Sequence, residues 1–290
     1  MIMSFAQAVL QLAIGVSFGL LLFLLASGFT LTFGLAGFVN LTHGAVFMVA
    51  AYVATALSSS SFPVAVLAAG ATGTVLSTLV YAVSRLRWTK LASDELSQVL
   101  LTFGLLLVFA ETARVLWEGL PRSLPEPGFA SGSWDLAGSA FPTYRVLMGG
   151  VALVLAGSLW WLQERTRFGA MVRAGVDDRD MLEATGVASG PLFLAVFALS
   201  GLLAGLAGGI GAPVLGAAMG QEFGVLVLAF VIVVLGGPGN LKGAFIASLT
   251  VGIADAYGKA LLPTFAEFTM MALVVVVLAW RPQGLFGGAR

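Results

Sequence analysis

The absence of charge from the first 84 residues constrains this chain more than any other feature. Its first charged residue is Arg85, and the whole chain of 290 residues has 14 basic and 14 acidic side chains. Charged residues make up 10% of it, whereas soluble proteins average roughly 25%. With a net charge of zero, the composition excludes a soluble enzyme, a disordered chain and a nucleic-acid binder, and it predicts an integral membrane protein.

Apolar runs along the chain predict an all-α, polytopic membrane fold. A spanning helix needs about 20 mostly apolar residues. We expect a single transmembrane domain over residues 1–290 with about 8–9 transmembrane helices, some of them broken or re-entrant. The candidate runs are residues 8–34, 36–58, 63–84, 96–118, 144–162, a run that starts at Pro191, 223–235, 243–261 and 264–280.

The charged loops between these runs indicate an orientation. Basic residues in short loops mark the cytoplasmic side, which predicts that residues 85–90 and the loop at about 163–189 are cytoplasmic. The loop at about 119–143 has Arg122 as its internal basic residue, so we expect it on the extracytoplasmic side. Counting spans back from Arg85 then places the N-terminus outside.

A polar, glycine-rich interruption at residues 34–44 is the most informative motif. It contains Asn40, Thr42, Gly44 and the only histidine, His43. Within a bilayer, non-helical backbone is tolerated where protein or a water-lined cavity satisfies it. Two interpretations remain: a gate or pathway element, which we favour for the whole interruption, and a structural break held by side-chain hydrogen bonds, which we favour for His43 alone.

Nine charged residues lie between Glu164 and Glu183. We expect a short helix over residues 169–185 that ends at Gly186, a typical position for glycine after a helix. An apolar stripe of Val172, Val176, Met181 and Leu182 predicts one buried side. The charges then form either a solvated surface or, as we favour, a docking site for a cytoplasmic partner, with Arg173, Asp177, Asp178, Glu183 and Gly186 as its candidate residues.

Two further patterns predict packing within the membrane. Gly201, Gly205 and Gly209 recur every four residues on one helix face, where another helix can approach closely; that helix belongs to this chain or to a second subunit.

Residues 236–243 interrupt an apolar region, either as a simple turn or as a second broken element. The spacings of Asp255 with Lys259 and of Glu111 with Arg114 predict structural ion pairs or snorkelling at the interface, which we favour over a proton relay, because an unpaired charge in a membrane is costly.

The sequence shows no pattern of an enzyme. It has no phosphate-binding Gly-x-x-x-x-Gly-Lys-Ser/Thr loop. It also has no cysteine and a single histidine, which leaves no expected zinc site. We therefore expect neither a metal, a cofactor nor a catalytic residue in this chain.

Four segments together resemble the permeases of branched-chain amino acid ABC transporters of the LivH type. They are residues 28–48, residues 173–187, the stretch 235–244 with Gly-Gly-Pro-Gly, and residues 281–287 with Arg-Pro-Gln-Gly-Leu-Phe-Gly. The resemblance covers essentially the whole chain and places a cytoplasmic ATPase-coupling loop at the second segment.

This resemblance implies a subunit of an ATP-driven importer in a bacterial inner membrane. Its expected partners are a homologous permease subunit, two cytoplasmic ATPase subunits that bind ATP-Mg, and a solute-binding protein outside. The resemblance extends to carriers of hydrophobic amino acids, urea, amides and aromatic acids, and the chain itself does not choose among them. The alternative is a secondary transporter or channel that works alone.

Overall fold

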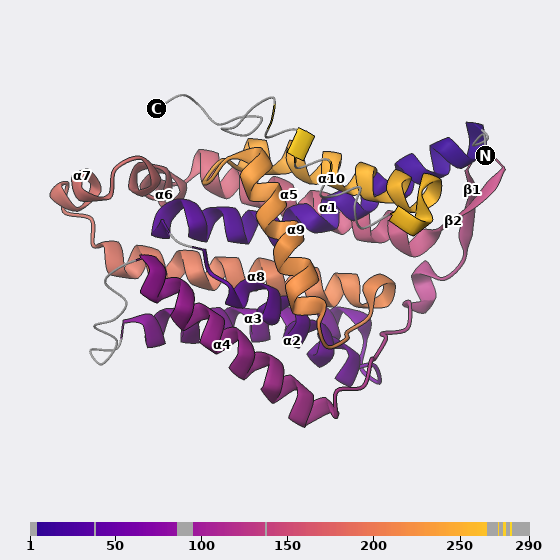
Figure 1. Cartoon of the computed structure of the whole chain (residues 1–290), viewed down its shortest axis with the longest axis horizontal. Helices are drawn as coiled ribbons and strands as arrows, with labels where there is room; N and C mark the ends of the chain where they lie inside the picture. The colour runs from indigo at the N-terminus through magenta and orange to yellow at the C-terminus, as the bar shows by residue number, and fades with distance from the viewer. Residues whose placement is uncertain are drawn as a thin grey trace.

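The computed structural model of the chain describes residues 5–37, 39–85, 95–136 and 138–265, with positions 272, 275, 276 and 279. Six of its described helices are long and apolar enough to cross a membrane. They confirm an all-α, polytopic membrane architecture (Figure 1). These helices are α1 (Phe5–Ala36), α3 (Phe62–Ser84), α4 (Glu95–Trp117), α5 (Thr143–Arg165), α8 (Ser189–Leu215) and α10 (Leu241–Leu261).

Two further apolar helices, α2 (Thr42–Ala56) and α9 (Gln221–Gly236), are too short to span a bilayer. The 15 residues of α2 extend over about 22 Å at 1.5 Å per residue, whereas the hydrocarbon core is about 30 Å thick. The predicted span 36–58 is therefore too long, and a count of eight or nine spans is not confirmed. The predicted span 264–280 lies largely outside the described residues, as do Arg87, Lys90 and the motif at 281–287.

The chain interruption before α2 is shorter than predicted. Helix α1 continues through Gly34 to Ala36, and Gly37 then takes a positive φ of 75°. A positive φ is a conformation that glycine adopts readily and other residues adopt rarely, so the helix ends there. The described non-helical backbone of this interruption consists of Gly37 and residues 39–41.

The cytoplasmic segment forms two helices where we predicted one. Helix α6 (Arg167–Asp177) and helix α7 (Arg179–Ala184) are separated by Asp178, which has extended backbone. The Asp178 carboxylate accepts a hydrogen bond from the backbone N–H of Met181 at 2.9 Å, the usual role of aspartate at a helix N-terminus. Gly186 follows α7 with a φ of 87°, which confirms its predicted position after the helix.

The loop between α4 and α5 contains a small sheet that the sequence did not predict. Strands β1 (Ser133–Leu136) and β2 (Ser139–Pro142) pair antiparallel, after a short 3-10 helix, η2 (Gly128–Ala130). Earlier in this loop, Arg122 exchanges two backbone hydrogen bonds of 2.8 and 2.7 Å with Ala217, in the turn between α8 and α9. The loop is thereby fixed to the helical bundle.

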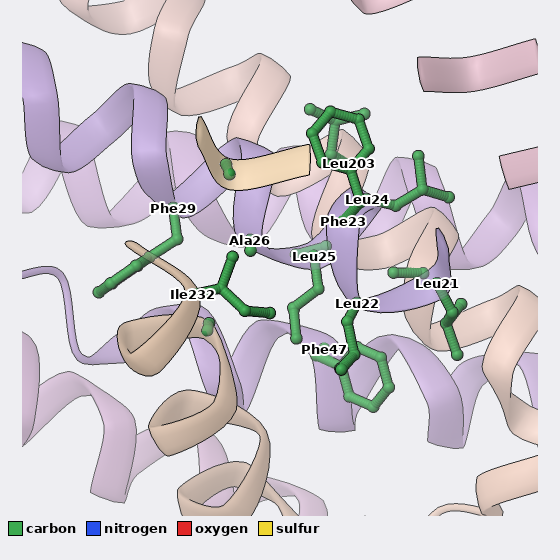
Figure 2. Close-up of a cluster of buried hydrophobic side chains, with 14 of the residues drawn as sticks. Leu21, Leu22, Phe23, Leu24, Leu25, Ala26, Phe29, Phe47, Leu203 and Ile232 are labelled. Atoms are coloured by element: carbon green, nitrogen blue, oxygen red, sulfur yellow. The ribbon is translucent and has the colours of Figure 1, made fainter. Parts of the chain in front are cut away.

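Helix α1 is the centre of the molecule. Between Gly15 and Thr32 all but one of its residues are buried, and it packs against α5, α6, α8, α9 and α10. Figure 2 shows side chains from its middle turns beside Phe47 of α2, Leu203 of α8 and Ile232 of α9. A helix that is apolar on all sides is expected to be surrounded by other helices, and α1 has this arrangement.

Close helix pairs in this bundle depend on glycine. A methyl group at Gly201 or Gly205 of α8 would collide with the backbone oxygen of Gly73 or Ala69 of α3, respectively. Gly209 also faces α3, so the predicted glycine row packs against a helix of this chain. On the other side of the bundle, a methyl group at Gly15 of α1 would lie 2.6 Å from the Cα of Ile253 in α10.

The two ends of the bundle differ in content (Figure 1). Helices α6 and α7 lie at one end, and the β1–β2 hairpin and the start of α1 lie at the other. Arg85 follows α3 near Gly190 at the start of α8, so the first basic residue lies at the same end as α6. This arrangement agrees with the predicted cytoplasmic and extracytoplasmic loops.

We predict that Gly201→Ala destabilises the protein, by roughly 1–3 kcal/mol or more, as overpacking does. Gly104 of α4 is the matched control, because a methyl group there meets nothing within 4 Å. Gly104→Ala should stabilise the helix by up to about 1 kcal/mol, since alanine is the better helix former. Unfolding midpoints in detergent measure both variants. Equal midpoints would contradict the close approach of α3 and α8.

Candidate functional site

Polar side chains bond to the backbone of Leu41 and Thr42, where the chain enters α2. The Asn40 side-chain oxygen accepts hydrogen bonds from the Thr42 backbone N–H at 3.2 Å and from the Thr42 hydroxyl at 2.6 Å. The Thr102 hydroxyl of α4 accepts one from the Leu41 N–H at 3.3 Å. Asn40, Thr42 and Thr102 are all buried, so protein groups replace the water that this backbone would otherwise need.

His43 connects three helices at the start of α2. Its Nε2 lies 2.8 Å from the Leu25 carbonyl oxygen of α1 and its Nδ1 lies 3.3 Å from the Ser200 hydroxyl of α8. Because a carbonyl oxygen can only accept, Nε2 donates and Nδ1 accepts from Ser200. The side chain is 2% exposed and both ring nitrogens have partners. This geometry supports the structural interpretation of His43.

Gly44 brings the two short helices together. A methyl group there would collide with the carbonyl oxygen of Glu222, in the first turn of α9. The Glu222 side chain is itself buried, and its Oε2 has no hydrogen-bond partner among the described residues. Sequence reasoning missed Glu222, although a single acidic residue ahead of an apolar run was a visible signal. The absence of a side chain at Gly44 thus allows α2 and α9 to approach closely at this point.

The exposed residues of α6 and α7 form what we call the coupling surface. It consists of Arg173, Asp177, Asp178, Asp180, Met181 and Glu183, all exposed. Val172 and Leu182 are buried, as the predicted stripe requires, but Met181 is not, because it is 64% exposed. The kink at Asp178 turns α7 and directs this large apolar side chain outwards. An exposed methionine among charges is suited to a protein contact.

Beneath the coupling surface, α1, α6 and the turn between α9 and α10 meet. We call this contact the glycine junction; it consists of Gly34, Val176 and Gly239. A methyl group at Gly34 of α1 would lie 2.6 Å from the Cα of Gly239, in the turn between α9 and α10. One at Gly239 would lie 2.8 Å from the Val176 Cγ1 of α6. The Gly239 N–H also donates to the carbonyl oxygen of Thr30 at 3.3 Å. The absence of two side chains thus allows α6, α1 and this turn to touch.

The predicted interruption at 236–243 is this turn between α9 and α10. Gly237 and Gly239 both have positive φ, and the Asn240 side chain accepts from the N–H of Gly243 at 3.0 Å. Lys242 lies 3.7 Å from the Glu164 carboxylate of α5. Both line a hollow of about 300 Å³ beside Arg173 and Asp177, so charged groups of three helices surround the junction.

Both predicted ion pairs are present. Lys259 Nζ lies 2.7 Å from the Asp255 carboxylate, and Arg114 contacts the Glu111 carboxylate at 2.5 and 2.8 Å. Across the described part of the chain, no group of three or more metal-ligating side chains is positioned to hold a metal ion.

We predict that His43→Leu lowers the free energy of unfolding by roughly 1–3 kcal/mol, because Ser200 and Leu25 lose a buried hydrogen-bond partner. His43→Gln, which keeps a donor, should lose less. Thermal unfolding in detergent measures stability, and solute uptake per folded molecule measures function. Lost uptake at unchanged stability would show that His43 acts in transport rather than in structure.

Comparison with known proteins gives a consistent result over nearly the whole chain. Among similar proteins, the permease BraD of the high-affinity branched-chain amino acid transport system of Pseudomonas aeruginosa is 25% identical over 96% of this chain and 95% of its own. LivH of Escherichia coli is 25% identical over 96% and 94%. LivM of Escherichia coli is 28% identical over 90% of this chain and 67% of its own. No solved structure matches.

The family model for the permease component of branched-chain amino acid transport systems matches residues 11–280. That range includes both short helices, the coupling surface and the glycine junction. The chain belongs to this family of membrane permease components.

Proposed function

We propose that this chain is the transmembrane permease subunit of an ATP-driven importer for branched-chain amino acids or a related small solute. Family membership supports the transport role, and the similarity to BraD and LivH, permeases of branched-chain amino acid transport systems, supports the solute class. The structural observation that supports an external motor is the coupling surface, a charged and exposed helix pair that lies directly on the glycine junction.

The proposal includes three kinds of partner. The chain is similar to both LivH and LivM, which are two permease proteins of one transport system in Escherichia coli, and this favours a homologous second permease subunit. Two cytoplasmic ATPase subunits bind ATP-Mg and dock on Arg173, Asp177, Asp178, Glu183 and Met181. A solute-binding protein delivers the solute on the opposite side of a bacterial plasma membrane. ATP hydrolysis is assigned to the ATPase subunits.

In the proposed mechanism, movement of the ATPases displaces α6 and α7. The Val176 side chain passes this displacement directly to Gly34 and Gly239, because neither glycine has a side chain of its own. The turn at Gly239 joins α9 to α10, and α9 contacts α2 at Gly44. The two short helices therefore shift together against the long helices, and the pathway opens alternately to each side.

The alternative, a channel or secondary transporter that works alone, makes a different prediction. Proteoliposomes with the chain, its permease partner and the ATPases, together with the solute-binding protein, should take up leucine when ATP is supplied. The chain alone should not. Leucine uptake by the chain alone, without ATP, would refute the proposed function and favour the alternative.

We predict that Met181→Asp reduces co-purification of the ATPases about tenfold or more, because buried apolar anchors dominate the free energy of protein interfaces. Phe129→Asp is the matched control, since Phe129 is another exposed apolar residue (69%) but lies in the η2 turn of the opposite loop. Immunoblots of the purified complex measure the effect. Equal ATPase recovery from both variants would contradict docking at α7.

The cap residue Asp178 gives a second, independent prediction. Asp178→Ala removes the acceptor for the Met181 N–H and should cost α7 about 1 kcal/mol. Asp178→Asn keeps the acceptor and should preserve the helix. Uptake in cells should therefore fall for the alanine variant and stay near normal for the asparagine variant. The reverse order, or equal losses, would show that the charge of Asp178 matters rather than its cap.

A further inference from the structure

A cavity of about 610 Å³ lies among the helices of the bundle, away from the coupling surface. Helices α1, α2, α8, α9 and α10 all contribute to its wall. Its volume falls within the roughly 300–1,000 Å³ that small-molecule sites occupy. Residues 40–44, which the sequence suggested as part of the pathway, are not among the described residues that line this cavity. The cavity is therefore separate from the predicted pathway site.

Most of the cavity wall is apolar. Leucines and aromatic rings of α1 and α2 form one side, and the first turns of α9 form the other. The principal residues are Phe18, Leu21, Leu22, Leu25, Phe47 and Val227. Such a wall suits an aliphatic side chain, and Gln221 is the one uncharged polar side chain among its described lining residues.

One ion pair interrupts the apolar wall. Asp255 and Lys259 of α10 both line the cavity, and their charged atoms lie 2.7 Å apart. The Asp255 side chain is 15% exposed and the Lys259 side chain 64% exposed, so the carboxylate lies deeper than the ammonium. Lys259 also lies over the Phe18 ring, 5.6 Å from its centroid. The cavity thus presents one acceptor and one donor side by side at the edge of an apolar surface.

A zwitterionic α-amino acid with an aliphatic side chain has the complementary arrangement. Its carboxylate can accept from Lys259, its ammonium can donate to Asp255, and its side chain can lie against Leu22 and Phe47. A simple amine or a simple carboxylic acid would satisfy only one member of the pair. Small-molecule sites generally combine an apolar lining with a few convergent polar groups that fix orientation.

The cavity is placed where a solute from outside would arrive. Lys259 lies in the last turn of α10, and the Tyr257 hydroxyl bonds to the Ala8 carbonyl oxygen at the start of α1. The cavity is therefore near the hairpin end of the bundle in Figure 1, opposite α6 and α7. Gln221 and Gly224 of α9 contribute to its wall, so movement of α9 changes its shape.

We propose that this cavity is a transient site for a zwitterionic aliphatic amino acid within the permease, with Asp255 and Lys259 as its charge-recognising residues. The inference rests on the proposed function, since it assumes that the chain transports such a solute. It adds a site in the permease itself, separate from the selectivity of any solute-binding protein.

The first test fills the cavity. A Cβ at Gly224 would meet nothing within 4 Å and Gly224 lines the cavity, so we expect Gly224→Trp to fold and to place its ring in that space. Gly104→Trp is the matched control, because Gly104 of α4 is exposed and a Cβ there would also meet nothing within 4 Å. In reconstituted complexes with ATPases and solute-binding protein, we expect Gly224→Trp to lower leucine uptake at least about tenfold, with ATP hydrolysis and subunit assembly retained, and Gly104→Trp to leave uptake unchanged.

The second test removes the charges. Asp255→Asn, Lys259→Met and the double variant should each reduce uptake about tenfold or more, the loss expected when a hydrogen bond to a charged group is removed. The double variant leaves no unpaired charge, so it separates lost recognition from a folding defect. Glu111→Gln with Arg114→Met removes the comparable exposed pair of α4 and should leave uptake unchanged.

The outcomes separate the site from the function it rests on. Normal uptake by Gly224→Trp, or by the double charge variant, would overturn the proposed site while leaving the importer intact. A wild-type complex that fails to take up leucine with ATP would instead overturn the proposed function and this site with it.

Discussion

The structure depends on one constraint: in an apolar surrounding, every backbone N–H and C=O must find a partner within the protein. Long helices satisfy it by themselves, and the chain leaves the helix only where polar side chains or neighbouring backbone take over. Asn40 and Thr102 bond to the backbone of Thr42 and Leu41, and Thr30 and Asn240 bond to the turn after α9. These two interruptions set where the short helices α2 and α9 lie.

Much of the fold was predictable, because apolar run length and charge placement directly reflect the membrane. The ends of α3, α4 and α10 lie within two residues of the predicted spans, and both ion pairs are confirmed. What the sequence could not give depends on tertiary contacts. The apolar run 36–58 contains a helix of only 15 residues, and Thr102 of another helix bonds to the backbone just before its start. The kink between α6 and α7 is accompanied by a single hydrogen bond to the Asp178 side chain, and Met181 is exposed after it. Gly44 and Glu222, which contact each other, lie far apart in sequence.

The candidate sites fall at opposite ends of the bundle and share helices. The coupling surface lies on the glycine junction, the junction contacts α1 and the turn that joins α9 to α10, and the cavity is lined by those same three helices. In the proposed importer, the close contacts at Gly34, Gly239 and Gly44 make this connection stiff, because backbone meets backbone with no flexible side chain between. A motor that pulls on α6 and α7 thus has a short route to the solute cavity.

The most direct test of this connection uses the absence of cysteine from the chain. A single cysteine at Gly224→Cys, in the assembled complex, can be labelled with a membrane-impermeant thiol reagent, first without nucleotide and then with ATP and vanadate. The proposed mechanism predicts that the labelling rate differs between the two states, whereas Gly104→Cys reacts equally in both. Identical rates for Gly224→Cys in both states would contradict a connection between the motor and the cavity.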